Sequence, residues 1–253
     1  MTALQPSLMP SAPGASQPLE SLTGGGTMIN WITVADADLP LFEDWYNFQH
    51  LVERVSTPGF RRARRFVAAQ RRTLDTTDFL TVYETDDVQV LSSPEYLRRL
   101  DSPTELTRRV VPLFVEFRRA ACTVTAVAGL GSSARVLAVE IPPGTDLAEV
   151  RRRLTTDHLP RLIAGHLLHV GSLHEPDAGV TAAKASTAEG RSSVTQQPAE
   201  SALLLLEPQT GVDADTVTAE LVDLLPGITG REFTLLFEMR SAPAPVAAQE
   251  GPA

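Results

Sequence analysis

The sequence predicts an α+β fold made of two tandem βαββαβ repeats, packed sheet to sheet around an eight-stranded barrel. Three observations lead to this prediction. The order of strand-like and helix-like segments over residues 28–128 recurs over residues 134–240. Matching residues recur about 108 positions apart, with His50 and His158 as the clearest pair. A βαββαβ unit covers one face of its sheet with helices, and a second copy can cover the other face.

In the first repeat, strands are predicted where β-branched and aromatic residues cluster, and helices where apolar residues recur every three or four positions. The elements are a strand at 28–34, a helix at 39–55, strands at 59–69 and 78–85, helices at 87–100 and 104–119, and a strand at 121–128. Leu39, Phe42, Tyr46 and His50 form one face of the first helix.

The second repeat follows the same order. Its elements are a strand at 134–141, a helix at 146–163 with Thr145 or Asp146 as N-cap, strands at 165–175 and 201–208, a helix at 213–225 and a strand at 231–240. Leu147, Val150, Leu154 and His158 repeat the apolar stripe of the first repeat. The two halves are therefore expected to present equivalent helices to equivalent sheets.

Three stretches are rich in small and polar residues and lack large apolar ones. Residues 1–27 are expected to form a flexible leader, residues 177–200 a flexible insertion in the second repeat, and residues 241–253 a flexible tail. The leader has no basic start and no apolar core, so it does not resemble a secretory signal.

Composition limits the classes of function. The chain has 253 residues, a formal net charge of −9, one cysteine and mean hydropathy of −0.03. A single cysteine excludes an intramolecular disulfide framework, and no apolar run approaches the length of a membrane span. The acidic balance argues against nucleic-acid and membrane partners. We expect a cytoplasmic monomer or homodimer whose partner is a small molecule.

Several residues of the first repeat resemble a known superfamily. Trp45, Tyr46, His50 and Leu51 precede Pro58-Gly59-Phe60 and a strand with Arg64 and Arg65, and Tyr83-Glu84 leads to Leu91, Ser93, Pro94 and Tyr96. This arrangement resembles the dimeric α/β-barrel superfamily, built from ferredoxin-like units, and within it the EthD-like and related uncharacterised proteins. The resemblance implies the fold and a small-molecule site. His158-Leu159-Pro160 is similar, but the second repeat lacks counterparts of Tyr46, Pro58-Gly59 and Tyr83.

His50 is the candidate general acid or base, because imidazole titrates near neutral pH. Tyr46 lies one helical turn before it and Glu53 three residues after it, so Tyr46 can hold a substrate oxygen and Glu53 can orient the ring. The alternative is structural: His50 lies near a helix end, where an imidazole can bind free carbonyl groups.

Arg62 and Arg64 are candidate substrate-binding residues, since alternation places them on one face of a strand and Arg61 and Arg65 on the other. The alternative is a solvated face. The remaining candidate substrate-binding residues are Trp45, Tyr83 and His158.

Other polar residues have simpler interpretations. Glu84 and Glu207 end matching strands, either as paired acids of one cavity or, as we favour, as surface charges. His166, His169 and His174 lie close together without a recognised ligand spacing, so no metal site is predicted. Cys122 lies in an apolar strand and is expected to be buried and inert.

The sequence therefore favours a small enzyme that uses acid–base chemistry, without a cofactor, on an apolar, aromatic or polyketide-like intermediate. Its reaction type stays open among isomerase, cyclase, decarboxylase and monooxygenase. One alternative is a non-catalytic protein that binds a small ligand or serves in an assembly, and another is a haem-dependent enzyme.

Overall fold

The structure, a computed structural model, describes residues 23–192, 196–198 and 200–241. The first half contains β1 (Gly26–Ala35), η1 (Asp36–Asp38), α1 (Leu39–Trp45), η2 (Tyr46–His50), α2 (Leu51–Val55), β2 (Phe60–Ala68), β3 (Thr76–Thr85), η3 (Val88–Ser92), α3 (Pro94–Asp101), α4 (Glu105–Val110), η4 (Val111–Leu113) and β4 (Phe114–Gly129).

The second half contains β5 (Arg135–Ile141), α5 (Leu147–Arg153), η5 (Leu154–His158), α6 (Leu159–Ala164), β6 (Leu168–Pro176), α7 (Ala178–Ala183), η6 (Lys184–Ser186), α8 (Ala188–Ser192), β7 (Gln196–Pro198), β8 (Ala202–Pro208), α9 (Ala214–Ala219) and β9 (Gly230–Arg240). None of the described helices is long and apolar enough to cross a bilayer.

Eight of the strands close into an antiparallel barrel in the order β1-β3-β2-β9-β5-β8-β6-β4, with β4 pairing back to β1. The pairs β2–β9 and β4–β6 join the two halves. Within each half the strand order is fourth, first, third, second: β4-β1-β3-β2 and β9-β5-β8-β6. This closed barrel with outer helices confirms the predicted α+β class and is consistent with a dimeric α/β-barrel-like fold.

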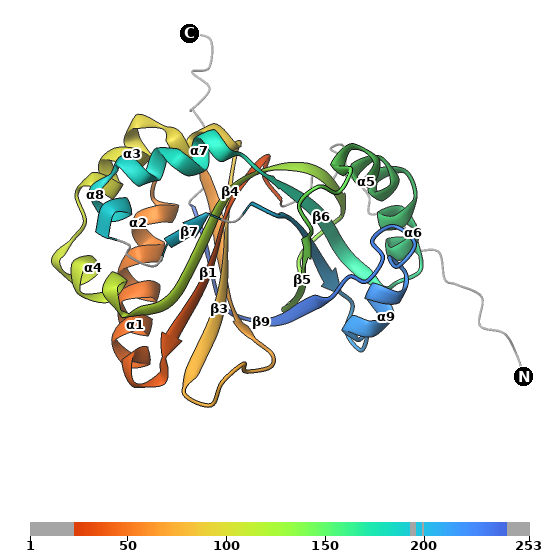
Figure 1. Ribbon diagram of the computed structural model, residues 1–253, viewed down its shortest axis with the longest axis horizontal. Helices are drawn as coiled ribbons and strands as arrows, with labels where there is room; N and C mark the ends of the chain where they lie inside the picture. Colours follow the sequence, from red (N-terminus) through yellow and green to blue (C-terminus); the bar gives the residue numbers. More distant parts are fainter. Residues whose placement is uncertain (1–22, 193–195, 199, 242–253) are drawn as a thin grey trace, which may run out of the picture.

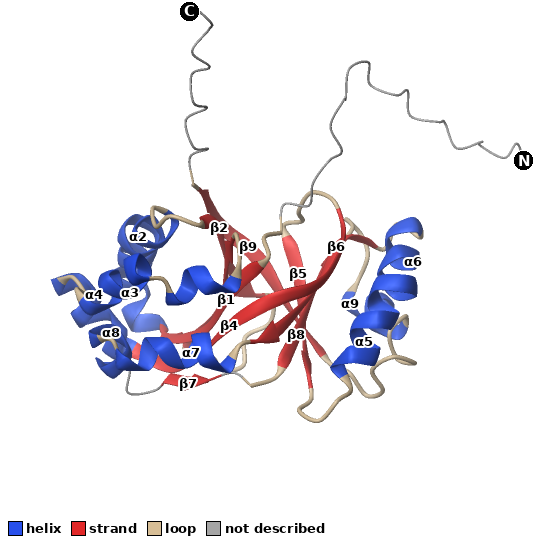
Figure 2. Ribbon diagram, turned by 90° about the horizontal axis from the view of Figure 1, so that it is seen from above, coloured by secondary structure: helices blue, strands red, loops and turns tan. Residues whose placement is uncertain are grey.

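Helices cover the barrel on two opposite sides (Figure 1). One side carries α1 to α4 together with α7 and α8, and the other carries α5, α6 and α9, as the view from above also shows (Figure 2). The apolar core accordingly has three parts: one layer between sheet and helices in each half, and a third inside the barrel.

Side chains fill the barrel interior. The cluster there includes Ile29, Phe66, Leu80, Leu203 and Phe233, all almost fully buried. Eight strands leave an interior that side chains can fill, and this cluster fills its middle. A hollow of about 180 Å³ lies beside Trp31, Asp78 and Arg231. The cavity that His50 lines is not in the barrel interior: it lies on the other side of the first sheet, between that sheet and its helices.

The predicted helix at 39–55 forms as one unbroken run, α1-η2-α2, in which η2 is a π-helical turn. The helix predicted over 104–119 is largely wrong: it ends with η4, and β4 begins at Phe114. Phe114 and Phe117 bury on the helix-covered face of β4, where they extend the apolar layer. Pairing with β1 along this whole segment outweighs its local helical pattern.

The N-terminal boundary also differs from the expected leader at 1–27. Gly26 and Thr27 already belong to β1, and residues 1–22 lie outside the described residues. A Cβ atom at Gly24 would lie 2.0 Å from the Thr85 carbonyl oxygen, and one at Gly26 would lie 2.3 Å from the Asp87 carbonyl carbon. The glycines at 24–26 thus permit a close backbone approach to the end of β3, rather than a loose linker.

The segment expected as a flexible insertion, 177–200, is folded wherever it is described, and it contains α7, η6 and α8. Although it belongs to the second half of the chain, it packs on the first half, against β4, η3 and α3. Several of its anchors are polar: Lys184 and Glu189 are buried, and the Asp101 side chain accepts a hydrogen bond from the Ala188 N–H. Val180 adds an apolar anchor in the core of the first half. Composition alone could not reveal this docking, because the segment contains no aromatic residue and few apolar residues larger than alanine. Of the expected tail at 241–253, residues 242–253 lie outside the described residues.

Candidate active site

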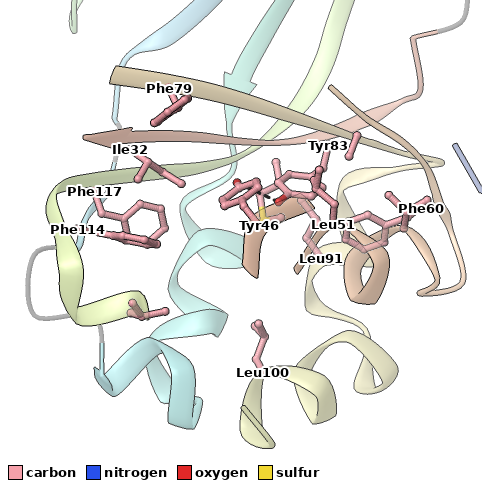
Figure 3. Close-up of a cluster of buried hydrophobic side chains, with 14 of the residues drawn as sticks. Ile32, Tyr46, Leu51, Phe60, Phe79, Tyr83, Leu91, Leu100, Phe114 and Phe117 are labelled. Carbon is pink, nitrogen blue, oxygen red and sulfur yellow. Dashed lines mark hydrogen bonds between the residues drawn. The ribbon is translucent and has the colours of Figure 1, made fainter. Parts of the chain in front are cut away.

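The candidate site lies between the first sheet and its helices. Its narrow cavity is lined by Met28, Asn30, Ile32, Trp45, Tyr46, His50, Arg54, Tyr96, Val111, Phe114, Phe117, Lys184 and Glu189. Figure 3 shows the apolar part of this layer, with Tyr46 and Tyr83 meeting beneath the sheet. The cavity volume is about 10 Å³, room for roughly one water molecule. A larger ligand therefore requires side chains to move.

The π-helical turn positions Tyr46 and His50. In this turn the Leu51 N–H bonds the Tyr46 carbonyl, five residues back, instead of the usual four. Such wider turns are rare and occur frequently at functional sites. The His50 ring packs against Trp45 and Tyr46, with ring centres 4.4 and 5.0 Å away. The second half has the same kind of turn in η5, which ends at His158.

A row of polar residues crosses the sheet beside the site, and one of them, Asn30, lines the cavity. Register places Arg119 of β4 beside Asn30 of β1, Asn30 beside Thr81 of β3, and Thr81 beside Arg65 of β2. All four side chains are buried. A polar row in the middle of a helix–sheet layer is costly unless its groups find partners, so it marks this part of the sheet as specialised.

Part of this polar row has hydrogen-bond partners, although Arg65 Nε has none. The Tyr46 hydroxyl donates to Thr81 Oγ1 at 3.0 Å and accepts from the Tyr83 hydroxyl at 3.1 Å. Arg65 binds Glu43 through both terminal nitrogens at 2.6 Å. Burial raises the pKa of Tyr46 and raises that of Tyr83 well above its ordinary value. Both phenols therefore stay neutral, and the Tyr46 proton is already committed to Thr81.

Three cavity residues carry buried polar atoms that have no hydrogen-bond partner. These atoms are Asn30 Oδ1, His50 Nδ1 and Arg54 Nη1. Leaving such groups unsatisfied costs on the order of 1–3 kcal/mol each, and more for a charged group. Three such residues lining one cavity are what a polar ligand site requires.

An ion cluster from two distant parts of the chain borders the same cavity. Arg54 Nη2 binds Glu189 Oε2 at 2.5 Å, and Lys184 Nζ lies 3.2 Å from Glu189 Oε1. Burial would raise the pKa of Glu189, but Arg54 and Lys184 hold it far below its ordinary value. Burial lowers the pKa of Lys184 to about 8, although Glu189 opposes the change.

His50 is electrically neutral near pH 7 in this setting. Burial lowers its pKa well below the ordinary value, and the positive charges of Arg54 and Lys184 act in the same direction, while Glu189 opposes them. A neutral imidazole with an unpartnered ring nitrogen is ready to accept a proton. Its conjugate acid would be strong, so the proton would be returned readily.

The structure places the remaining predicted site residues at different distances from the cavity of His50. Glu53 accepts a hydrogen bond from Gln49 and lines a shallow surface hollow, so it does not orient His50. Trp45 lines the cavity, while Tyr83 reaches it through Tyr46. His158 lies in the other half, where Arg161 is 3.3 Å from its Nδ1.

Arg62 and Arg64 share a face, as alternation predicted, but that face points into the barrel. Arg62 Nε donates to Glu84 at 2.8 Å, and Arg64 bridges Glu207 at 2.7 Å and Glu84 at 3.2 Å. Both arginines and both glutamates are buried, so the solvated-face and surface-charge interpretations are wrong. The four residues form an ion network on the opposite side of the sheet from His50.

The other groups considered as candidates, His174 and Cys122 among them, take part in structural contacts or are buried. His174 is hydrogen-bonded through both ring nitrogens, to Thr27 and Ser172. No group of three or more metal-ligating side chains occurs within the described part of the chain. Cys122 is buried, as expected, and burial raises its pKa to about 12.

Sequence reasoning missed Asn30, Arg54, Lys184, Glu189 and Arg119. Two signals were available: Arg54 follows His50 by one helical turn, and Asn30 is the only amide in an apolar strand. Lys184 is also the only lysine in the chain. The docking of α7 and α8 on the other half could not be inferred from spacing.

Comparison with known proteins identifies relatives in structure. An anthrone oxidase-like protein matches with a TM-score of 0.56 and 10% identity, over 91% of this chain and 100% of its own. The likeness is one of fold. Candidate monooxygenases from Fusobacterium nucleatum and Lactobacillus acidophilus match with TM-scores of 0.46 and 0.48, at 11% and 6% identity. These matches cover 86% and 85% of this chain and 95% of each neighbour. No family profile matches the chain, and no curated protein matches its sequence.

Proposed function

We propose that the protein is a small monooxygenase-type enzyme that acts without a cofactor on an aromatic or polyketide-like substrate. One observation carries the proposal: unpartnered polar atoms of Asn30, His50 and Arg54 meet at one aromatic-lined cavity of the first half. The name of the anthrone oxidase-like neighbour adds support for oxygenation over the other reactions open to such a site.

The first chemical step is proton abstraction from an activated carbon. His50 accepts the proton, and the negative charge that develops on the substrate oxygen lies near Arg54. A fixed cation in a buried site stabilises such charge strongly, which offsets the weak basicity of His50. Because the Tyr46 hydroxyl donates its hydrogen bond to Thr81, Tyr46 positions the substrate and does not protonate it. Arg54 therefore replaces Tyr46 as the residue that stabilises the oxyanion.

The second step requires only molecular oxygen. The substrate carbanion adds to O₂, and the hydroperoxide that follows protonation by His50 loses water to leave a carbonyl group. A CH₂ group and O₂ thus give C=O and H₂O, with all four electrons supplied by the substrate carbon. No external reductant is required for this balance.

Substrate access depends on the segment that carries Lys184 and Glu189. The cavity is too narrow for an aromatic ring, so binding must displace side chains at its border. The α7–α8 segment borders the cavity through polar contacts, which water can replace more easily than it can replace an apolar interface. We propose that this segment moves outward to admit substrate.

Oxygen uptake with anthrone as the substrate tests the proposal. The full chain, treated with a chelator, should consume about one O₂ per anthrone and form the quinone. His50→Gln should abolish this uptake, whereas His158→Gln, at the matching position of the second half, should not. Uptake that is equal in the wild type and His50→Gln would contradict the proposal.

A ligand-binding protein without catalysis is the second candidate function. The lowered pKa of His50 favours it, because a weak base removes a proton from carbon poorly. Tight binding of an aromatic ligand without turnover, across a panel of activated phenols and ketones, would favour this candidate over the enzyme.

We further infer that residues 28–128 and 134–240 are duplicated units, the first of them EthD-like. The shared strand order and the matching π-helical turns that end at His50 and His158 support this inference. Loss of the polar row from the second unit would then confine the site to the first.

A further inference from the structure

Arg119 is a fully buried arginine with almost no partners. It lies on β4, on the helix-covered face of the sheet, and its exposed fraction is 0%. Both terminal nitrogens, Nη1 and Nη2, lack a hydrogen-bond partner, and Nε contacts only the Met28 sulfur, at 3.2 Å. No carboxylate in the described ranges lies within ion-pair distance of it. Burying an unpaired guanidinium is among the most costly arrangements in a protein.

Arg119 adjoins the wall of the candidate cavity. Met28, which it contacts, lines that cavity, and its cross-strand neighbour Asn30 lines it too. Lys184 is close enough that the charge of Arg119 contributes to lowering its pKa. Arg119 is therefore not itself a lining residue but lies directly behind Met28 and beside Asn30, two residues that line the cavity.

Positive charge exceeds negative charge around this cavity. Arg54 and Lys184 both bind Glu189, so one carboxylate serves two cations before Arg119 is counted. A bound anion would complete this balance. Because the two terminal nitrogens of a guanidinium form a planar fork, they match the two oxygens of a carboxylate.

The surroundings of the cations are aromatic. Lys184 Nζ lies 4.9 Å from the centre of the Phe117 ring, and the Arg54 guanidinium lies 5.7 Å from that of Tyr96. Both rings line the cavity. These surfaces favour a flat ring attached to the anion over a small hydrated anion such as phosphate.

We propose that Arg119, with Lys184, binds a carboxylate group on an aromatic ligand of this cavity. The proposal rests on the proposed function in naming a substrate class for the same site. It defines that class as aromatic acids whose carboxylate lies against β4 while the reacting carbon faces His50.

Binding of 2-naphthoate to the full chain, measured by titration calorimetry, tests the proposal. Methyl 2-naphthoate serves as the neutral isostere, and inorganic phosphate as the simple anion. Arg118→Gln is the matched control for Arg119→Gln, because Arg118 is the next residue on β4 and pairs with Glu140 away from the cavity.

We expect the acid to bind at least tenfold more tightly than both the ester and phosphate. Arg119→Gln should remove this preference, and Arg118→Gln should retain it. The proposal is overturned if the ester binds as well as the acid, if phosphate binds more tightly, or if Arg119→Gln binds the acid normally. The comparison of acid with ester uses only the wild type, so it tests the carboxylate proposal even if Arg119→Gln fails to fold.

The assay measures binding alone, so its result is separate from turnover. Oxygen uptake with neutral anthrone but no preference for the acid would refute the carboxylate site and leave the enzyme proposal standing. Preference for the acid without turnover of any substrate would support the carboxylate site and refute the enzyme proposal.

Discussion

The two helix–sheet layers of the molecule share a strand order and differ in what they bury. The layer of the second half is a continuous apolar cluster, with Leu137, Val139, Leu204 and Leu206 facing the helices. The layer of the first half has the row Arg119, Asn30, Thr81 and Arg65 across its centre. An apolar layer serves stability, whereas a buried polar row costs stability and is retained where chemistry needs it.

The matching histidines show the same contrast. His50 faces an aromatic cavity with an unpartnered Nδ1 and with cations nearby. His158 ends an equivalent π-helical turn and also has a ring nitrogen, Nε2, without a hydrogen-bond partner, but its surroundings differ: Arg161 is 3.3 Å from its Nδ1, and the carboxylates of Asp157 and Asp223 are 3.8 Å from its Nε2. Equal backbone position therefore does not give equal chemistry, because the neighbours of the ring decide what it can do.

The largest expected effect separates these two histidines. His50→Ala should lower kcat/KM for an oxidised substrate by about 10²- to 10⁴-fold, the usual contribution of a general base. His158→Ala should change it less than about twofold by the same standard. Steady-state oxygen uptake measures both. If the two variants lose activity equally, the assignment of the site to the first half is wrong.

The second prediction concerns the ion cluster that ties α8 to the first half. Glu189→Ala leaves Arg54 and Lys184 without this carboxylate in a buried site, so the free energy of unfolding should fall by about 3 kcal/mol. Glu220→Ala removes the partner of the half-exposed Arg161 and should cost less than about 1 kcal/mol. Urea denaturation measures both. Similar losses would mean that α8 is not held by its buried charges.

The third prediction uses the lowered pKa of Lys184, about 8. As the pH rises through this value Lys184 loses its charge, so the affinity for 2-naphthoate should fall, by up to about tenfold per pH unit. Lys184→Arg should move this fall to higher pH, because arginine keeps its charge. A flat affinity between pH 7 and 9.5 would show that the charge of Lys184 does not contribute to binding.

The smallest effect is on stability in mild acid. Burial lowers the pKa of His174 to about 3 and that of His50 well below its ordinary value, so below pH 6.5 the unfolded chain binds protons that the folded protein does not. Stability should therefore decrease as the pH falls, by roughly 1 kcal/mol per pH unit for each histidine between about pH 6 and 5. His174→Asn should remove about half of this slope. An unchanged slope would place His174 in a wetter site than its contacts indicate.

Periodicity predicted most of the fold and little of the site. The helix at 39–55 and the strands around it follow from local patterns, which is why Tyr46 and His50 could be placed together. Arg62 and Arg64 were placed on one face correctly, but no local signal says which face of a sheet turns toward helices. Arg119 lay in a predicted helix, and the strand that replaces it is formed by long-range pairing with β1.

The site also depends on contacts that join distant segments. Arg54 and Glu189 are separated by 135 positions, and only the fold of α7 and α8 over the first half brings them together. Their segment has the composition of a loop, because buried charges anchor it together with one small apolar residue, Val180. Sequence patterns detect apolar anchoring well and detect buried ion pairs poorly.

The imidazole signals of the five histidines, followed by NMR during titration with 2-naphthoate, test the central claim most directly. Binding in the cavity of the first half should move the resonances of His50 and leave those of His158 and His174 in place. A shift of His174, inside the barrel, or of His158, in the second half, with His50 unchanged, would contradict the account.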